Sequence, residues 1–287
     1  MPVVVAHGWI ALASLFVVLA TAVSLAFTYV GAPLIERGTG LALHVAFAAY
    51  GFMGMLALGL SYILVPMFAL SAAPAERHAL ASCALAALAL VLAGAAAFDI
   101  APAPLRVVAV IAAAGAVAVH LRLMAVALKT GMRRELGRSF RLVRISWALL
   151  ALGLAAALAV ALDAPFAGMQ TLFGLTLIAG WLLTFLLGIL QRIVPFLASM
   201  HKPPGKAPPR TPSSLTDDRP LAVHFWCHLA ALALLALAVI ADSAWIAALA
   251  ALVGAAGAAA FAAFFVILLL RMRRPPAPRR ARDAPVA

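Results

Sequence analysis

Eight long apolar stretches constrain this chain more than any other feature. They run at roughly residues 8–30, 41–70, 79–98, 104–128, 145–162, 166–199, 221–241 and 243–270. A helix needs about 20 apolar residues to cross the hydrocarbon core of a bilayer. The chain is 67% hydrophobic and 10% charged, whereas soluble globular proteins are about one quarter charged. We therefore predict an all-α, polytopic membrane protein with eight transmembrane helices.

The positive charges predict how the chain is oriented. Lys and Arg collect in alternate connections, chiefly 129–144, 202–219 and 271–282, while the opposite connections hold Arg37 and Arg106 beside acidic residues. The positive-inside rule then places both termini in the cytoplasm, as expected for a multi-pass protein of the bacterial cytoplasmic (inner) membrane. The net charge of +12 marks topology and contacts with lipid head groups rather than nucleic-acid binding. Since no Lys or Arg precedes the first apolar stretch, we interpret it as a retained span.

Two of the stretches share a skeleton of glycine and proline. Gly51, Gly59 and Pro66 recur at Gly180, Gly188 and Pro195, and 180−51, 188−59 and 195−66 each give 129. Small residues at this spacing let neighbouring membrane helices approach closely, and an internal proline bends a helix. Cys83 and Cys227 each begin a similar Ala/Leu-rich segment, and they imply no disulfide because they lie on different spans.

These matches predict an internal duplication, with the eight helices arranged as two parallel four-helix repeats. Each repeat has an even number of spans, so both share one orientation in the membrane and a ligand is expected between them. The first repeat covers 1–130, and 131–200 starts the second with two spans. A Pro-rich cytoplasmic linker follows at 201–220, then two spans at 221–271 and a basic tail at 272–287.

Polar side chains inside the spans are candidate functional groups, because burying them in a bilayer is costly. Tyr62 and Gln191 are repeat equivalents, each four residues before its proline. Their simplest role is to bond backbone carbonyls that the prolines free; the alternative is to line a polar path. The other candidates inside spans are His120, Thr184 and Arg192. His7, His78 and His201 are expected at the aqueous boundary.

His224 and His228 form a candidate metal pair. Residues four apart lie on one helical face, a spacing that suits copper or zinc, and Cys227 lies between them in the sequence. An interfacial structural role for both histidines is the alternative.

His44 is a candidate ligand for haem. It lies in the outer part of a glycine-rich span, where glycines leave room for a porphyrin. Its repeat equivalent is Phe173, which excludes a symmetric pair of histidines. Met169, one turn before Phe173, is the candidate second ligand.

The pattern H44-x6-GFMG-x4-G-x2-Y-x3-PMF, with its second copy GW-x6-G-x6-PFLASMH, resembles a group of bacterial polytopic membrane proteins. That group is described as similar to haem–copper oxidase subunit I and to the haem–copper membrane proteins of the nitric-oxide response. The resemblance covers the two repeated helices, and it implies that His44 is the counterpart of a histidine that ligates a b-type haem. The paired histidines that bind copper in oxidases have no counterpart here, so oxygen reduction is not implied and no catalytic residue is predicted.

Two classes of function remain open, beside a third, non-catalytic one, a structural or partner-binding subunit. One is a haem- or copper-binding accessory of a respiratory oxidase, with respiratory-chain proteins or a second copy of the chain as partners in the bilayer. The other is a small-solute transporter or channel-like protein with a path lined by Tyr62, Thr184, Gln191 and Arg192. No acidic residue lies deep in a span to couple protons or sodium, which weighs against transport.

Overall fold

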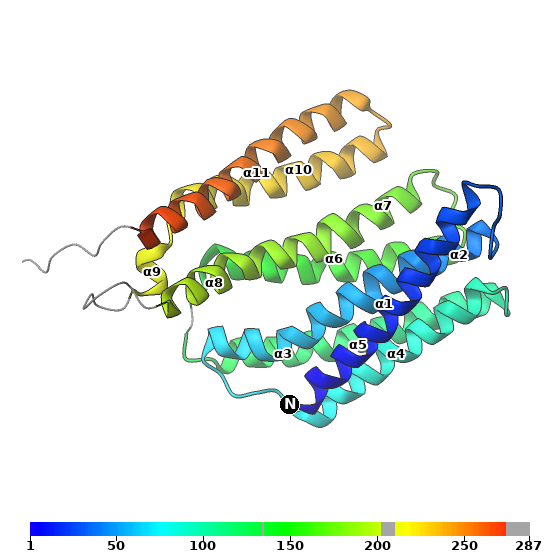
Figure 1. The fold of residues 1–287 in the computed structure, drawn as a ribbon, viewed down its shortest axis with the longest axis horizontal. Helices are drawn as coiled ribbons and strands as arrows, with labels where there is room; N and C mark the ends of the chain where they lie inside the picture. The colour runs from blue at the N-terminus through cyan, green and yellow to red at the C-terminus, as the bar shows by residue number, and fades with distance from the viewer. Residues whose placement is uncertain (134, 202–209, 274–287) are drawn as a thin grey trace, which may run out of the picture. The chain divides into compact units, whose positions relative to one another are not determined.

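A computed structural model describes residues 1–133, 135–201 and 210–273 of the chain (Figure 1). Within these residues the regular structure is helical, without strands, and eight helices are long and apolar enough to cross a membrane. They are Pro2–Thr28 (α1), Arg37–Ala69, Glu76–Ala97 (α4), Pro102–Thr130 (α5), Gly137–Ala161 (α6), Met169–Met200, Asp218–Ile240 (α10) and Ala244–Arg273 (α11). The predicted all-α class and the number of spans are confirmed.

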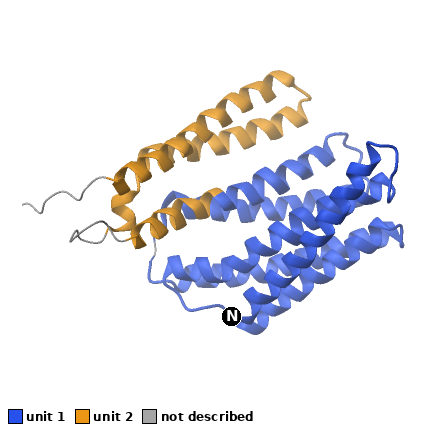
Figure 2. Cartoon of the chain, viewed as in Figure 1, with its two compact units in different colours: residues 1–186 blue, residues 187–287 orange. Residues whose placement is uncertain are grey.

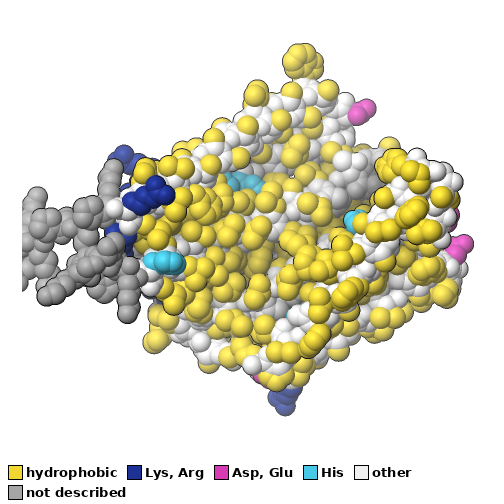
Figure 3. Space-filling view, in the orientation of Figure 1, with side chains coloured by type: hydrophobic (Ala, Val, Ile, Leu, Met, Phe, Trp, Pro, Cys, Tyr) yellow, Lys and Arg dark blue, Asp and Glu magenta, His cyan; other side chains and the backbone are white. Residues whose placement is uncertain are grey.

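Hydrophobic side chains dominate the face drawn in Figure 3. Large ones such as Phe16 and Leu252 are exposed. A soluble domain of this length would cover such residues, whereas lipid solvates them. The exposed apolar surface therefore supports a multi-pass protein in contact with the bilayer.

The largest boundary difference is at α6, which begins eight residues before the predicted start at 145. Its first turns are amphipathic: Arg138, Arg141 and Arg144 are exposed, while Phe140 and Val143 between them are buried. Apolar length alone does not detect such a segment, because the charged residues lie on one face and interrupt the apolar run.

The described chain divides into two compact units, residues 1–186 and 187–287, coloured separately in Figure 2. The division falls inside helix α8 (Thr184–Met200). Most of the predicted linker and basic tail, 202–209 and 274–287, lies outside the described residues. The arrangement as two four-helix repeats stays a prediction.

The second and sixth spans each contain a π-helical segment. The second consists of α2 (Arg37–Ala46), η1 (Phe47–Gly54) and α3 (Met55–Ala69), and the sixth of α7 (Met169–Leu175), η2 (Thr176–Leu183) and α8. The starts and the ends of η1 and η2 are each 129 residues apart, since 176−47 and 183−54 both give 129. This is the separation found for the glycines and prolines, and π-helical segments are frequent at functional sites.

The glycines of the first copy, Gly51 and Gly59, are close-contact points. A Cβ at Gly51 would lie 2.5 Å from the Ser14 hydroxyl oxygen of α1, and one at Gly59 would lie 2.6 Å from the Cβ of His7. In the second copy, a Cβ at Gly180 would meet Leu149 of α6 at 3.4 Å. The glycines of η1 and α3 therefore let α1 pack closely against the second span.

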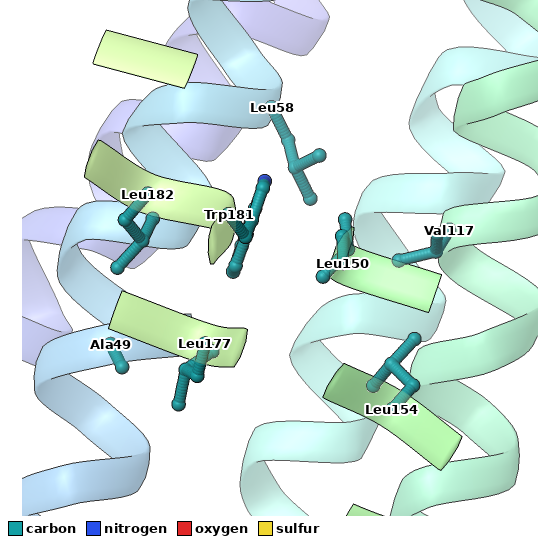
Figure 4. Close-up of a cluster of buried hydrophobic side chains, with 8 residues drawn as sticks. All are labelled: Ala49, Leu58, Val117, Leu150, Leu154, Leu177, Trp181 and Leu182. Carbon is teal, nitrogen blue, oxygen red and sulfur yellow. The ribbon is translucent and has the colours of Figure 1, made fainter. Parts of the chain in front are cut away.

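The core of unit 1 joins helices from both halves of the sequence. One cluster of this core contains Ala49 of η1, Leu58 of α3, Val117 of α5, Leu150 and Leu154 of α6, and Leu177, Trp181 and Leu182 of η2 (Figure 4). The Trp181 indole packs where Gly54 has no side chain, because a Cβ at Gly54 would lie 2.9 Å from the ring. The two π-helical segments thus pack against one another through Trp181.

Unit 2 is built on the helix pair α10 and α11, with the short helix α9 (Pro212–Leu215) beside α11. Its core contains Leu215, Leu221, Phe264 and Leu268. The Arg271 guanidinium bonds the Asp217 carboxylate at 2.8 Å and the carbonyl of Thr216 at 2.6 Å, and Asp217 caps α10 by accepting from the Arg219 amide. These contacts fasten the start of α10 to the end of α11.

Candidate functional site

A large apolar cavity lies within unit 1. Its volume is about 1100 Å³, and its wall is formed by α2, η1, α3, α4, α5, α6, α7 and η2. Twelve of the wall residues are alanine, so the space exists because short side chains do not fill the gap between helices. Binding pockets for small molecules reach about 300–1,000 Å³ and are mostly apolar with a few polar groups. The cavity has the size and character of such a pocket.

Polar side chains surround the mouth of the cavity, at the predicted outer end of unit 1. Exposed Glu36, Asp99, Arg106 and Gln170 all contribute to its wall there. Glu36 is also the N-cap of α2, because its carboxylate accepts the backbone N–H of Gly38 at 2.8 Å and of Thr39 at 2.7 Å. These bonds lower the pKa of the Glu36 carboxyl, so it stays charged at neutral pH. The mouth is therefore charged while the interior is apolar.

Two aromatic residues of the π-helical segments line the cavity farther in. The rings of Tyr50 in η1 and Trp181 in η2 lie 5.9 Å apart, and both belong to the wall. The Tyr50 hydroxyl is buried and forms no hydrogen bond among the described residues. It is therefore available to a ligand in the cavity.

A second group of buried polar residues lies on α1, α3 and α5, away from the mouth of the cavity. We define it as the polar cluster of His7, Tyr62 and His120. The ring centroids of His7 and Tyr62 are 5.7 Å apart, and those of Tyr62 and His120 are 5.0 Å apart. All three residues are at most 1% exposed, and the Trp147 ring closes the far side at 6.3 Å from His120. Three helices, α1, α3 and α5, thus bring buried polar groups to one point.

No family model, curated protein or solved structure matches this chain. The function is therefore argued from the cavity and the polar cluster themselves.

Sequence reasoning missed His7 as a member of this cluster. It was expected at the aqueous boundary, but α1 already begins at Pro2, so His7 lies in the second turn and is 1% exposed. The Val3 amide donates to the Glu76 carboxylate at 2.7 Å, which fixes the start of α1 against α4. The burial of His7 depends on its contact with Gly59 of α3. The sequence does not predict this contact, because it does not say which span packs against which. His78 and His201 are exposed, as expected.

The expected bonds from Tyr62 and Gln191 to freed carbonyls are not formed. Both side chains are buried, yet the Tyr62 hydroxyl and the Gln191 amide nitrogen have no hydrogen-bond partner among the described residues. Pro66 and Pro195 lie inside α3 and α8 as predicted. Each proline frees the carbonyl of the residue four positions earlier, and that residue is Tyr62 or Gln191 itself.

His44 and Met169 lie on different helices, α2 and α7. The Nδ1 of His44 lies 3.2 Å from the Thr21 hydroxyl of α1, and Met169 opens α7. Neither residue belongs to the wall of the large cavity. A haem held by this pair stays a prediction.

His224 and His228 do lie together, with stacked rings at 5.6 Å. His224 donates from Nδ1 to the Gly257 carbonyl at 3.1 Å, and the Cβ of Cys227 faces the same glycine. In the part of the chain that is described, no three His, Cys, Asp or Glu side chains form a group that could hold a metal. The predicted pair therefore lacks a third ligand of these types. Arg192 is half-buried in α8.

Proposed function

We propose that the protein binds a lipophilic small molecule inside the bilayer, in the cavity of unit 1. The observation that supports this proposal is an apolar cavity of about 1100 Å³ with charged side chains at its mouth. Along α5 the wall runs from Arg106 to Val117, 11 residues and so about 16 Å at 1.5 Å per residue. That length suits an alkyl chain of roughly ten carbons with a ring.

The position of the cavity supports a ligand site between two related halves. Its wall includes α4 and α5 from the first half of the sequence and α6 and η2 from the second. The matching positions of η1 and η2, 129 residues apart, favour the duplication into two parallel repeats. Ligand sites between such repeats are common in membrane transport proteins.

The same geometry favours small-molecule binding over the haem- or copper-binding accessory function. The part of the cavity wall formed by described residues contains no histidine or cysteine, and Met55 supplies its one sulfur atom. A haem in this space would lack the imidazole ligand that the resemblance implies. Transport of the ligand, in a bacterial cytoplasmic membrane with both termini in the cytoplasm, is compatible with the proposal.

Photolabelling is expected to locate the ligand. A decylbenzene derivative that carries a diazirine should label peptides of α4, α5 and α6 in the purified protein, because their alanines face the cavity. Excess decylbenzene should suppress this labelling and leave the labelling of lipid-facing residues unchanged, since only the cavity saturates. Mass spectrometry of the labelled peptides measures both. Equal suppression at all sites, or none in the wall, would refute the proposal.

An absorption spectrum tests the haem alternative. We expect no Soret band that depends on His44, because the His44 side chain contacts Thr21 of α1 and stands outside the cavity wall. The His44→Ala variant should keep the saturable labelling of the wild type. A Soret band in the purified protein that disappears in His44→Ala would replace this proposal with the haem function.

A further inference from the structure

The polar cluster of His7, Tyr62 and His120 contains four buried polar atoms without a hydrogen-bond partner among the described residues: His7 Nε2, the Tyr62 hydroxyl, and both ring nitrogens of His120. Leaving one buried donor or acceptor unpaired costs about 1–3 kcal/mol. Buried polar groups in native proteins are almost always satisfied. Four orphaned atoms at one point therefore indicate a partner that binds there.

The hydrogen-bonding capacity of the cluster can be assigned from its contacts. The Nδ1 of His7 lies 2.8 Å from the carbonyl of Val3, and a carbonyl only accepts, so Nδ1 carries the proton and the neutral ring offers Nε2 as an acceptor. A neutral His120 offers one donor and one acceptor, and the Tyr62 hydroxyl offers both. The cluster itself contains no permanently charged side chain. It is suited to a neutral partner that donates and accepts at once, as a hydroxyl group does.

The neighbouring polar side chain can serve the cluster only as an acceptor, next to Tyr62. The Ser82 hydroxyl of α4, which is 1% exposed, donates to the carbonyl of Ala116 at 2.8 Å. Its single proton is used in this bond between α4 and α5, so the ring nitrogens of His7 and His120 still need a partner. The aromatic rings around the cluster, Tyr62 and Trp147 among them, provide flat apolar sides for a planar group.

The cluster lies one helical turn beyond the deep end of the cavity. Leu58 and Ala116 line the cavity, and the residues four positions further along the same helices are Tyr62 and His120. On α4, Ala86 lines the cavity and Ser82 is four positions away in the direction of the cluster. Four residues span about 6 Å of helix and return to the same face. On each of the three helices, one turn therefore separates the cavity wall from the cluster.

We propose that the polar cluster binds the neutral hydroxyl head group of an amphipathic molecule whose apolar part occupies the cavity. The head group donates to a free acceptor nitrogen of the histidines and accepts from Tyr62 or His120. Leu58, which lines the cavity one turn before Tyr62 and whose unbranched Cβ permits several rotamers, is the side chain that moves aside. This inference rests on the proposed function, and it narrows the ligand from any lipophilic molecule to a hydroxyl-bearing amphiphile.

A matched pair of competitors tests the inference. In the photolabelling experiment, 4-decylphenol and decylbenzene differ only by the hydroxyl group. We expect half-suppression of wall labelling at a concentration about tenfold lower for the phenol, the effect of roughly one net hydrogen bond. In Tyr62→Phe and in His120→Leu the phenol should lose this advantage while decylbenzene competes as in the wild type. His78→Leu, at an exposed histidine, is the control and should change neither value.

The outcomes separate the inference from the function on which it rests. If both compounds compete equally in the wild type, or if the phenol keeps its advantage in both variants, the head-group site is overturned while the cavity remains a binding site. If neither compound competes, the proposed function fails first. Tyr62→Phe removes one oxygen and keeps the ring, so it gives a result even if His120→Leu does not fold.

Discussion

Replacing Ala93 of α4 and Ala113 of α5 together by phenylalanine is expected to abolish saturable binding of decylbenzene. Both alanines line the cavity and both are half-buried, so two rings would enter the space from adjacent helices. We expect an affinity loss of more than about tenfold, which corresponds to more than about 1.4 kcal/mol. The measurement is the competitor concentration that halves photolabelling of the α6 part of the wall.

The matched control places the same two rings on the outside of the same helices. Val91 and Ala114 are exposed, and neither lines the cavity. Val91→Phe with Ala114→Phe should bind decylbenzene like the wild type, because the added rings meet lipid. If the cavity variant binds as well as this control, the ligand does not occupy the cavity.

Replacing Gly59 by alanine is expected to lower the stability of the protein. The new Cβ would lie 2.6 Å from the Cβ of His7, so α1 must shift away from α3. Overpacking of this kind typically costs about 1–3 kcal/mol. Thermal unfolding in detergent, followed by intrinsic fluorescence, measures the effect. Because His7 moves with α1, the tenfold preference for 4-decylphenol should also decrease.

Gly8→Ala is the matched control on the facing helix. No atom outside its own helix backbone and chain neighbours lies within 4 Å of a Cβ at Gly8, and alanine is favoured over glycine in a helix interior by about 1 kcal/mol. We expect an unchanged or slightly raised unfolding temperature. Equal unfolding temperatures for Gly59→Ala and Gly8→Ala would contradict the close packing of α1 on α3.

The sequence predicts the fold of this chain well at the level of individual helices. Hydrophobic length finds all eight spans because crossing a bilayer imposes a minimum length on every one of them. It misses the first turns of α6, where Arg138, Arg141 and Arg144 break the apolar run on one face only. The π-helical character of η1 and η2 was not predicted, since it arises from backbone bonding that leaves no residue pattern of its own.

The candidate site is only partly predictable from the sequence. Tyr62 and His120 were identified because polar groups inside a span are rare, and the structure places both in the polar cluster. His7 and Trp181 were not identified, because their roles depend on which helices face one another. The cavity itself is defined by alanines, which carry no chemical signal, and it becomes visible only when α4, α5 and α6 are assembled.

The π-helical segment η1 has a consequence for the rotational setting of the second span. An i to i+5 closure holds one more residue in a turn than an α-helical closure does, so everything after it is rotated about the helix axis. Tyr50 inside η1 and Met55 just after it are five residues apart, and both line the cavity. The i to i+5 closure of η1 thus keeps these two side chains on the cavity side of the span. The second span can therefore continue the cavity wall from η1 into α3 and still present Gly59 and Tyr62 to His7 of α1.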